Sequence, residues 1–211
     1  IVQALAIFAC TCRSGVSAFS IASRYSVCVT RRQHHPGADR PILPLFWLLS
    51  DRRNDAGIET ALQSLPTGSG FVFRHYHLEP DTRLARFDEL AAIARQCGHT
   101  VILSGDDDWG AEGHYGSATR PRDGLFLATA HNEDELAAAV AAGAEGIFLS
   151  PVFATASHPG AKTLGIDAFH ALARQSPVPV IALGGMTHER ARELGWSRWG
   201  AIDGLGSTNV A

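Results

Sequence analysis

The sequence predicts an α/β fold with a parallel sheet, and within that class a compact TIM (β/α)8 barrel with some helices shortened or missing. Short, almost continuously apolar segments alternate with Ala- and Leu-rich segments of helical spacing along residues 41–211. This is the pattern of a parallel sheet covered by helices. Seven or eight such units in about 170 residues suit a compact barrel. A doubly wound open sheet is the alternative, but no GxGxxG motif follows the first strand.

Each strand is predicted where an apolar run meets a polar or turn-forming residue. The first, LPLFWLLSD, ends at an acid, and the third, HTVILSGD, breaks into an acidic turn. The last, WGAIDGLGS, runs into glycines. In chain order the predicted strands span residues 43–51, 70–78, 99–106, 123–132, 145–153, 178–185 and 199–207.

The predicted helices have apolar residues at helical spacing and recognisable ends. NEDELAAAVAAG is the clearest, because Asn132 is a favoured N-cap, three acids occupy the first turn and Gly143 follows as a stop. RLARFDELAAIARQCG likewise stops at Gly98. In chain order the predicted helices span residues 56–65, 83–98, 132–143, 166–175 and 187–196.

The first forty residues differ from the rest in charge. They carry five arginines against one acid, a net charge of +4, whereas residues 41–211 carry 13 basic and 20 acidic residues, a net charge of -7. We therefore expect residues 1–40 to be an extension that is disordered or lies upstream of the true start, and residues 41–211 to be the barrel. The Arg- and Ser-rich, acid-poor composition of residues 1–40 also resembles a transit peptide, and this alternative stays open.

The overall composition argues against several classes of protein. A net charge of -3 and a pI near 6.4 argue against general nucleic-acid binding. The apolar run 1–12 is far too short to span a bilayer, and no basic amphipathic helix suggests a membrane surface. We therefore expect a cytoplasmic protein with small-molecule partners and neither a nucleic-acid nor a membrane partner. The sequence leaves the oligomeric state open, a homo-oligomer included.

Two glycine-rich turns follow the last two predicted strands. Gly184 and Gly185 come after VIAL, and Gly204, Gly206 and Ser207 come after AID. In (β/α)8 barrels the loops after strands seven and eight commonly bind phosphate, because glycine lets backbone N–H groups approach the anion. These five residues are candidates for phosphate binding. The alternative is that the glycines only make tight turns.

The loop at 154–165 gathers hydrogen-bond donors after a strand. Thr155, Ser157, His158 and Lys162 supply two hydroxyls, an imidazole and the single ammonium of a chain whose other 17 basic residues are arginines. Such groups suit the charge that develops on a phosphate or diphosphate leaving group. The first three are candidate catalytic residues, and Lys162 is a candidate for phosphate binding. A solvated surface loop is the alternative.

The second predicted strand carries an arginine among aromatic residues. With a period of two, Arg74 and Tyr76 share one face, and His75 and His77 share the other. An arginine inside a barrel needs an anionic partner, because an unpaired buried charge is costly. Arg74 is therefore a candidate catalytic residue. A structural salt bridge to an inward-facing acid is the alternative.

Asp106 opens an acidic turn, Asp106-Asp107-Asp108, directly after the third strand. Proteins commonly hold Mg²⁺ through one or two carboxylates, while the ion keeps waters and binds substrate phosphate oxygens. Asp106 is therefore the candidate metal ligand. A solvated acidic turn is the alternative.

Taken in order, these motifs resemble the thiamine phosphate synthase/TenI superfamily of TIM barrels over roughly residues 43–207. The most specific parts are GIFLSPVFATASHPGAKTLG and PVPVIALGG, which look like the family's GPVFxTxTK…G loop and its following phosphate strand. The resemblance implies a transferase of thiamine biosynthesis. It would join hydroxymethylpyrimidine diphosphate to thiazole phosphate and release diphosphate, with Mg²⁺ as cofactor.

The resemblance also carries residue roles over by position. Thr155 and Ser157 match the hydroxyl pair of the family loop, and Thr129 matches a serine near the diphosphate, which makes it a further candidate catalytic residue. The glycine pair 184–185 and the turn 204–207 match the family's cradle for thiazole phosphate.

This chain departs from the family pattern at the diphosphate end. The lysine of TxTK is His158, the QLREK strand appears as VFRHY, and the Asn-Asp after the third strand is Ser104-Gly105. Two further hypotheses therefore stay open. One is a TenI-like thiazole phosphate tautomerase, which needs neither diphosphate nor Mg²⁺, although Pro151 stands where such enzymes carry their histidine. The other is a non-catalytic barrel that binds a phosphorylated ligand and regulates another protein.

Overall fold

A computed structural model describes residues 42–117, 123–157, 160 and 162–205 of the chain. These residues run from before the first strand of the barrel to beyond the last. The expectations for residues 1–40, His158, Gly206 and Ser207 lie outside the described residues.

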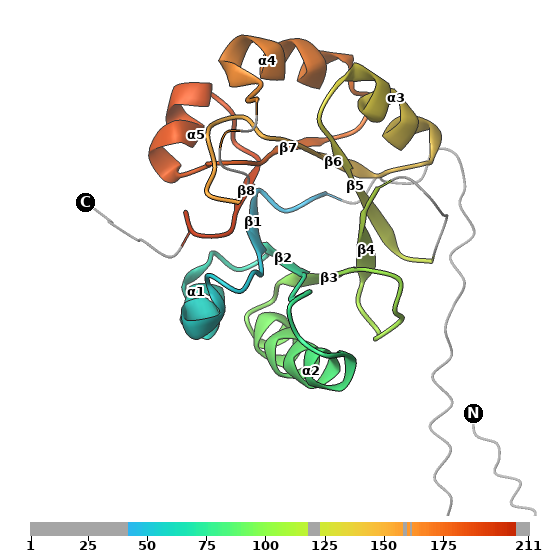
Figure 1. Cartoon of the computed structure of the whole chain (residues 1–211), viewed down its shortest axis with the longest axis vertical. Coiled ribbons are helices and arrows are strands. Elements are labelled where there is room, and N and C mark those ends of the chain that lie inside the picture. Colours follow the sequence, from blue (N-terminus) through green and yellow to red (C-terminus); the bar gives the residue numbers. More distant parts are fainter. Residues whose placement is uncertain (1–41, 118–122, 158–159, 161, 206–211) are drawn as a thin grey trace, which may run out of the picture. The chain divides into compact units, whose positions relative to one another are not determined.

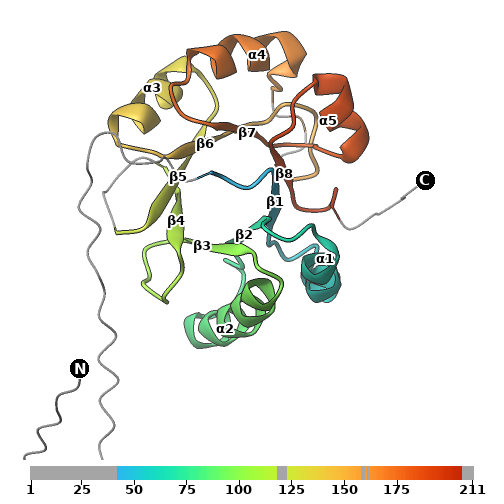
Figure 2. The same ribbon diagram turned by 180° about the vertical axis from the view of Figure 1, so that it is seen from behind.

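Eight parallel strands close into a barrel, as the sequence predicts (Figures 1 and 2). In chain order they are β1 (Phe46–Leu49), β2 (Gly70–Phe73), β3 (Thr100–Ser104), β4 (Gly113–Gly116), β5 (Leu125–Ala130), β6 (Gly146–Leu149), β7 (Val180–Ala182) and β8 (Trp199–Ala201). Each strand pairs with its neighbours in sequence, and β1 pairs with β8 to close the barrel. The closing register sets Phe46 opposite Trp199 and Leu48 opposite Ala201.

The helices lie outside the barrel and leave the β3–β4 side without one (Figure 1). They are α1 (Ile58–Ser64), preceded by the 3-10 turn η1 (Asp55–Gly57), then α2 (Pro80–Gln96), α3 (Glu133–Ala141), α4 (Gly165–Gln175) and α5 (His188–Leu194). The connection from β3 to β4, residues 105–112, is described throughout and consists of bends without a helix. The prediction of a barrel with shortened or missing helices is therefore confirmed.

Several predicted boundaries are wrong, and each has a local cause. The predicted strand 70–78 ends at Phe73, because His75 has a φ of 32°, which an extended strand does not accommodate. Strand β4, with the sequence GHYG, lies outside the predicted set because it has no apolar run; pairing with β3 and β5 makes it a strand. The helix predicted from residue 83 begins at Pro80, since proline is favoured in the first turn.

The cap predicted for α3 is present. The Asn132 side chain accepts a hydrogen bond from the Glu135 backbone N–H at 2.9 Å. Gly143 follows the helix with a φ of 83°, a conformation that glycine adopts without strain. Among the described residues, no helix is both long enough and apolar enough to cross a membrane.

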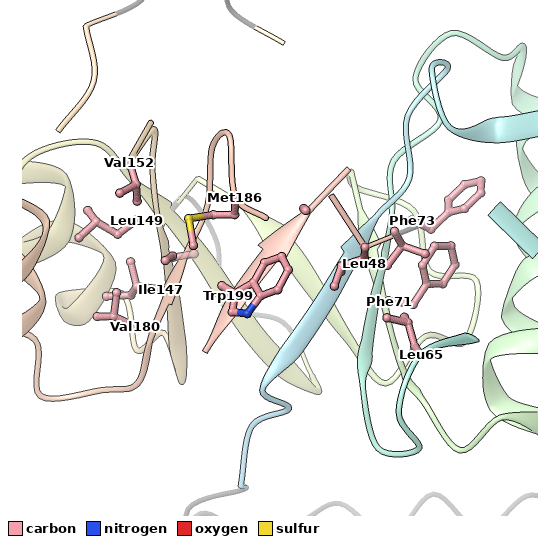
Figure 3. Packing of buried hydrophobic residues seen from close by; sticks show 14 of the residues in the cluster. Leu48, Leu65, Phe71, Phe73, Ile147, Leu149, Val152, Val180, Met186 and Trp199 are labelled. Carbon is pink, nitrogen blue, oxygen red and sulfur yellow. The ribbon is translucent and has the colours of Figure 1, made fainter. Parts of the chain in front are cut away.

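Apolar side chains form one layer inside the barrel and another between the strands and the helices. The inner layer consists of Leu43, Trp47, Leu49, Val72, Ile102, Leu127, Phe148 and Ile181, all buried. Alternate residues of the same strands point outward, and Figure 3 shows part of this outer layer, with Leu48, Phe71 and Phe73 on one side and Ile147, Leu149 and Val180 on the other. Because Val72 points inward on β2, the same alternation directs Arg74 toward the mouth of the barrel.

Candidate functional site

A cavity of about 1060 Å³ opens at the carboxyl ends of the strands, which is where (β/α)8 barrels carry their active sites. Loops that follow β1, β2, β5, β6, β7 and β8 contribute to its wall. Seven of the predicted site residues line the cavity: Arg74, Thr129, Thr155, Ser157, Gly184, Gly185 and Gly204. The fold thus brings together candidates that lie up to 130 positions apart in the sequence.

The glycine pair after β7 packs against the loop after β6 too closely for side chains. Gly184 and Gly185 have φ values of 93° and 64°. A Cβ on Gly184 would lie 2.6 Å from Cα of Pro151, and one on Gly185 would lie 2.4 Å from the carbonyl oxygen of Ala154. Arg190 donates from Nη1 to the Gly185 carbonyl at 2.5 Å. The turn is therefore fixed, and its backbone lies directly against the cavity.

Arg74 enters the cavity from the end of β2. Tyr76 lines the same cavity, whereas His75 is fully buried behind it and stacks on Phe73 at 4.8 Å between ring centroids. The two faces expected from the alternation are therefore observed, although the strand ends earlier than predicted. Among the described residues Arg74 forms no ion pair, so the alternative of a structural salt bridge is not seen there.

The backbone of Arg74 is held on both sides. Its N–H donates to Oγ of Ser50 at 2.7 Å, and its carbonyl accepts from Nε of Arg83 at 3.0 Å. Arg83 is itself buried, pairs with Asp107 at 3.0 Å and lies 4.8 Å from the centroid of the Trp109 ring. Because both sides of the Arg74 peptide are hydrogen-bonded, its side chain is the part that can change conformation when a ligand binds.

Ser50 belongs to a buried chain of polar groups. Its Oγ lies 2.7 Å from Nδ1 of His75, and Nε2 of His75 lies 2.9 Å from Oδ1 of Asp55. Arg86 donates to the same carboxylate oxygen through Nε and Nη2, at 3.0 and 2.7 Å. Because Nε2 faces a carboxylate, it carries the ring proton, and Nδ1 accepts from the Ser50 hydroxyl. The chain therefore runs from Arg86 through Asp55 and His75 to the peptide of Arg74.

The protonation states in this chain follow from burial and hydrogen bonding. Burial lowers the pKa of His75 and outweighs the opposing effect of the hydrogen bond that His75 donates to Asp55. Burial alone would raise the pKa of Asp55, but the hydrogen bonds from His75 and Arg86 outweigh it and bring the pKa below 3.8. A neutral His75 beside an ionised Asp55 is thus the state at neutral pH.

Arg53 connects three loops at the mouth of the barrel. Its Nη2 donates to Oγ of Ser157 at 2.7 Å, and its guanidinium pairs with Asp51 at 3.0 Å and with Asp203 at 3.3 Å. The loops after β1, β6 and β8 therefore meet through one arginine. Sequence reasoning missed Arg53. The signal that could have found it is the basic pair Arg52-Arg53 directly after the first strand.

Hydroxyl groups and aromatic rings line the cavity beside Arg74. Tyr76 and Ser104 are hydrogen-bonded through their hydroxyls, and Oγ of Ser104 lies 3.3 Å from the carbonyl of Tyr115, to which it donates. Burial raises the pKa of Tyr115 to about 12, so its phenol stays protonated at neutral pH. Tyr115 comes from the unpredicted strand β4, which is why sequence reasoning missed it.

Two predicted site residues lie away from this cavity. Lys162 and Asp106 are both exposed, and neither lines the cavity. Gly105, with a φ of 116°, turns the chain at the end of β3. Asp107, the next acid, pairs with Arg83 on α2 outside the barrel. Asp107 is thus directed toward α2.

The described residues offer no cluster of ligands for the Mg²⁺ that the resemblance implies. They contain no group of three or more His, Cys, Asp or Glu side chains that could hold a metal ion. The undescribed segments of the barrel portion, residues 118–122, 158–159, 161 and 206–211, contain no Asp or Glu in their sequence. The carboxylates on the cavity wall are Asp203, which pairs with Arg53, and Glu189. Mg²⁺ thus stays a prediction without a matching ligand set.

His131 is a further cavity residue that sequence reasoning missed. It follows β5 and lines the cavity, and its Nδ1 lies 2.6 Å from Oε2 of Glu135 in the first turn of α3. The hydrogen bond from His131 is the main reason that the pKa of Glu135 lies below its usual value. The ionised Glu135 keeps the ring proton on Nδ1, so Nε2 can act as an acceptor. The signal in the sequence is the spacing of His131 and Glu135 by four residues.

The sequence comparisons with known proteins find thiamine-phosphate synthases. The sequence model described as thiamine monophosphate synthase matches residues 119–201. A thiamine-phosphate synthase of Methanoregula boonei is 32% identical over 130 residues, covering 54% of this chain and 60% of that protein. A thiamine-phosphate synthase of Thermosynechococcus vestitus is 27% identical over 156 residues, covering 67% of this chain and 44% of that protein.

Solved structures show the same fold. Thiamine phosphate pyrophosphorylase from Pyrococcus furiosus superposes with a TM-score of 0.66 at 19% identity, covering 78% of this chain and 89% of that chain. This chain spans only part, 44% and 60%, of the two curated synthases named above. The second half of the chain is thus similar in sequence to the thiamine phosphate synthase/TenI superfamily, and the barrel as a whole shares the fold of the solved pyrophosphorylase.

Proposed function

We propose that this chain is a thiamine-phosphate-synthase-like transferase of thiamine biosynthesis. Its substrates would be hydroxymethylpyrimidine diphosphate and thiazole phosphate. The bond between the pyrimidine methylene carbon and the diphosphate oxygen breaks, and its electron pair leaves with diphosphate. The thiazole nitrogen then forms the new carbon–nitrogen bond. This dissociative reaction depends on neutralising the leaving group more than on a general base.

The observation that carries the proposal is the convergence of anion-binding groups on one cavity. The glycine turn after β7 lines the cavity together with two arginines of α5, Arg190 and Arg192. Arg74, Thr155 and Thr129 line the same cavity from other loops. Two separated groups of donors suit two phosphorylated substrates that react between them.

The residues take distinct parts in this proposal. Gly184, Gly185 and Gly204 bind the phosphate of the thiazole through backbone N–H groups, with Arg190 holding the turn in place. The guanidinium of Arg74 and the hydroxyls of Thr129 and Thr155 bind the diphosphate. Ser157 contributes through Arg53, to which its hydroxyl is already hydrogen-bonded.

The direct test is turnover of the two phosphorylated substrates by the full chain, with thiamine phosphate detected by chromatography. We expect product, and we expect Arg74→Gln to reduce its rate by about tenfold or more, because a charge-assisted hydrogen bond to the leaving group is lost. Arg174→Gln is the matched control, since Arg174 is exposed on α4 and lies outside the cavity. The absence of product at micromolar enzyme contradicts the proposal.

A thiazole phosphate tautomerase is a second candidate, favoured by the His131–Glu135 pair. Nε2 of His131 would take a proton from one carbon of the thiazole phosphate isomer and return it at another ring position, with no change of oxidation state. Interconversion of the isomers without metal, abolished by His131→Gln, would support this reaction. Binding of thiazole phosphate with neither reaction would indicate the non-catalytic alternative.

A further inference from the structure

We propose that the diphosphate end of this cavity binds its anion without a metal ion, with arginine charge taking the place of Mg²⁺. The inference rests on the proposed function, because it concerns the leaving group of that reaction. It predicts a site that binds diphosphate, or a diphosphate monoester, in its metal-free form.

The end of β3 offers a serine rather than a carboxylate. Ser104 lies there, and its hydroxyl is already hydrogen-bonded to the Tyr76 hydroxyl and to the Tyr115 carbonyl. Ser104 is also buried. A serine hydroxyl enclosed by two tyrosines supplies no charge, whereas Mg²⁺ prefers carboxylate oxygens in an open octahedral arrangement.

Three acids near the cavity are already paired with arginines. Asp51 and Asp203 both pair with Arg53, at 3.0 and 3.3 Å, and Asp107 pairs with Arg83 at 3.0 Å. Burial alone would raise the pKa of Asp51, but its contacts with Arg53 outweigh that effect, and the pKa lies below its usual value. A metal ion would therefore have to displace an arginine from each of these carboxylates.

Four arginines line the cavity, Arg53, Arg74, Arg190 and Arg192, against the two acids Asp203 and Glu189. Asp51 and Asp203 balance the charge of Arg53, and Arg190 and Arg192 lie on α5 beside the glycine turn, so Arg74 is the cation among the described residues that is left for the diphosphate end. The cavity is thus positive within a barrel portion whose net charge is -7. A guanidinium is permanently charged and binds phosphate oxygens through two parallel hydrogen bonds, so it neutralises an anion without help from a free cation.

The backbone of Arg74 is anchored at the cavity. Ser50 and Arg83 fix the two sides of its peptide, at 2.7 and 3.0 Å. The side chain beyond this anchor forms no ion pair with the described residues and lies 5.7 Å from the centroid of the Tyr76 ring. A guanidinium placed in advance on a fixed backbone loses less freedom when it binds an anion than a mobile one does.

Isothermal titration calorimetry of the full chain with inorganic diphosphate tests the proposal. One titration contains excess EDTA and the other contains excess MgCl₂. We expect binding in EDTA, with an affinity no weaker than about a third of the value in Mg²⁺. We expect Arg74→Gln to weaken binding by about tenfold or more in EDTA. The affinity of Arg74→Lys for diphosphate should lie between those of the unaltered chain and Arg74→Gln, because lysine keeps the charge but loses the paired hydrogen bonds.

Arg174→Gln serves as the control that should bind diphosphate as the unaltered chain does, and circular dichroism verifies that each variant is folded. Binding that appears only with Mg²⁺, or that Mg²⁺ strengthens by more than about threefold, overturns the proposal. Absence of diphosphate binding in both buffers overturns it as well. The proposed function is judged separately, because formation of thiamine phosphate in the turnover assay can succeed or fail whatever the metal dependence of diphosphate binding.

Discussion

His75 is a non-glycine residue with a positive φ, in a conformation that most side chains avoid. The surrounding structure compensates through both ring nitrogens, which bind Ser50 and Asp55, and through stacking on Phe73. The result is a sharp turn directly after Arg74. The strained backbone at His75 thus helps to place the side chain of Arg74 in the cavity.

Substitution of His75 tests this coupling. His75→Leu leaves the Ser50 hydroxyl and the Asp55 carboxylate without their partner, and we expect a loss of about 2–4 kcal/mol of unfolding free energy. His75→Asn should lose less, because asparagine tolerates a positive φ and its amide oxygen can accept from Ser50. Urea denaturation measures both. Equal losses for the two variants would contradict the explanation.

The protonation of His75 predicts how stability depends on pH. Because burial lowers the pKa of His75 in the folded state, the unfolded chain binds the proton more readily. The corresponding stability is present above the unfolded pKa of about 6.5 and is lost as the pH falls toward the folded value. We expect the unfolding free energy to decrease between pH 7 and pH 5, and to decrease less in His75→Asn. If the difference in unfolding free energy between the unaltered chain and His75→Asn stayed the same from pH 7 to pH 5, titration of His75 would not explain the pH dependence.

At the scale of elements, the turn after β7 requires glycine for two separable reasons. Gly185 and Gly195 have nearly the same φ, 64° and 63°. A Cβ on Gly185 would meet the Ala154 carbonyl at 2.4 Å, whereas one on Gly195 meets nothing within 4 Å. The difference between alanine substitutions at the two positions therefore isolates the cost of close packing from the cost of the dihedral.

We expect Gly195→Ala to cost about 1 kcal/mol of unfolding free energy, from the left-handed conformation alone. Gly185→Ala should cost about 2 kcal/mol more and should abolish phosphate binding, since the loops after β6 and β7 must separate. Urea denaturation measures the stability, and calorimetry with inorganic phosphate measures the binding. If both variants lose the same stability, the packing argument fails.

The N-cap of α3 offers a second element-scale prediction. Asn132→Ala removes the acceptor for the Glu135 N–H and should cost about 1 kcal/mol. It should also loosen the contact between Glu135 and His131, because Asn132 donates to Glu135 at 2.9 Å. Glu133→Ala, at an exposed position in the same turn, should change stability by less than about 0.5 kcal/mol. Thermal or urea unfolding of the two variants gives the comparison.

Elements with a strong periodic pattern could be predicted from sequence, and elements defined by their neighbours could not. α3 shows its cap and its stop in the sequence, whereas β4 has the strand pairing without an apolar run. The same division holds in the cavity. Arg74 could be predicted from alternation, but the role of Arg53 depends on Asp203 and Ser157, which lie more than 100 positions away. No local pattern encodes such a contact.

At the scale of the whole molecule, the anion-binding cavity depends on closure of the barrel. β8 is three residues long and completes the ring by pairing with β1 through Trp199, Gly200 and Ala201. Its pairing with β7 is limited to one register pair, Ala182 opposite Trp199. The parallel neighbours elsewhere in the barrel share three or four such pairs. The β7–β8 junction is therefore the thinnest part of the wall.

The thin junction lies between the glycine turn after β7 and Gly204, the two sides of the proposed phosphate cradle. Brief local opening of the wall should therefore begin there, and amide hydrogens of β7 and β8 should exchange with solvent faster than those of β2 and β3. A phosphorylated ligand that bridges the two turns would act as a clamp across the gap and slow that exchange selectively. Hydrogen–deuterium exchange followed by mass spectrometry, with and without thiazole phosphate, measures both effects. Uniform protection of all strands would show that the junction is as stable as the rest of the ring.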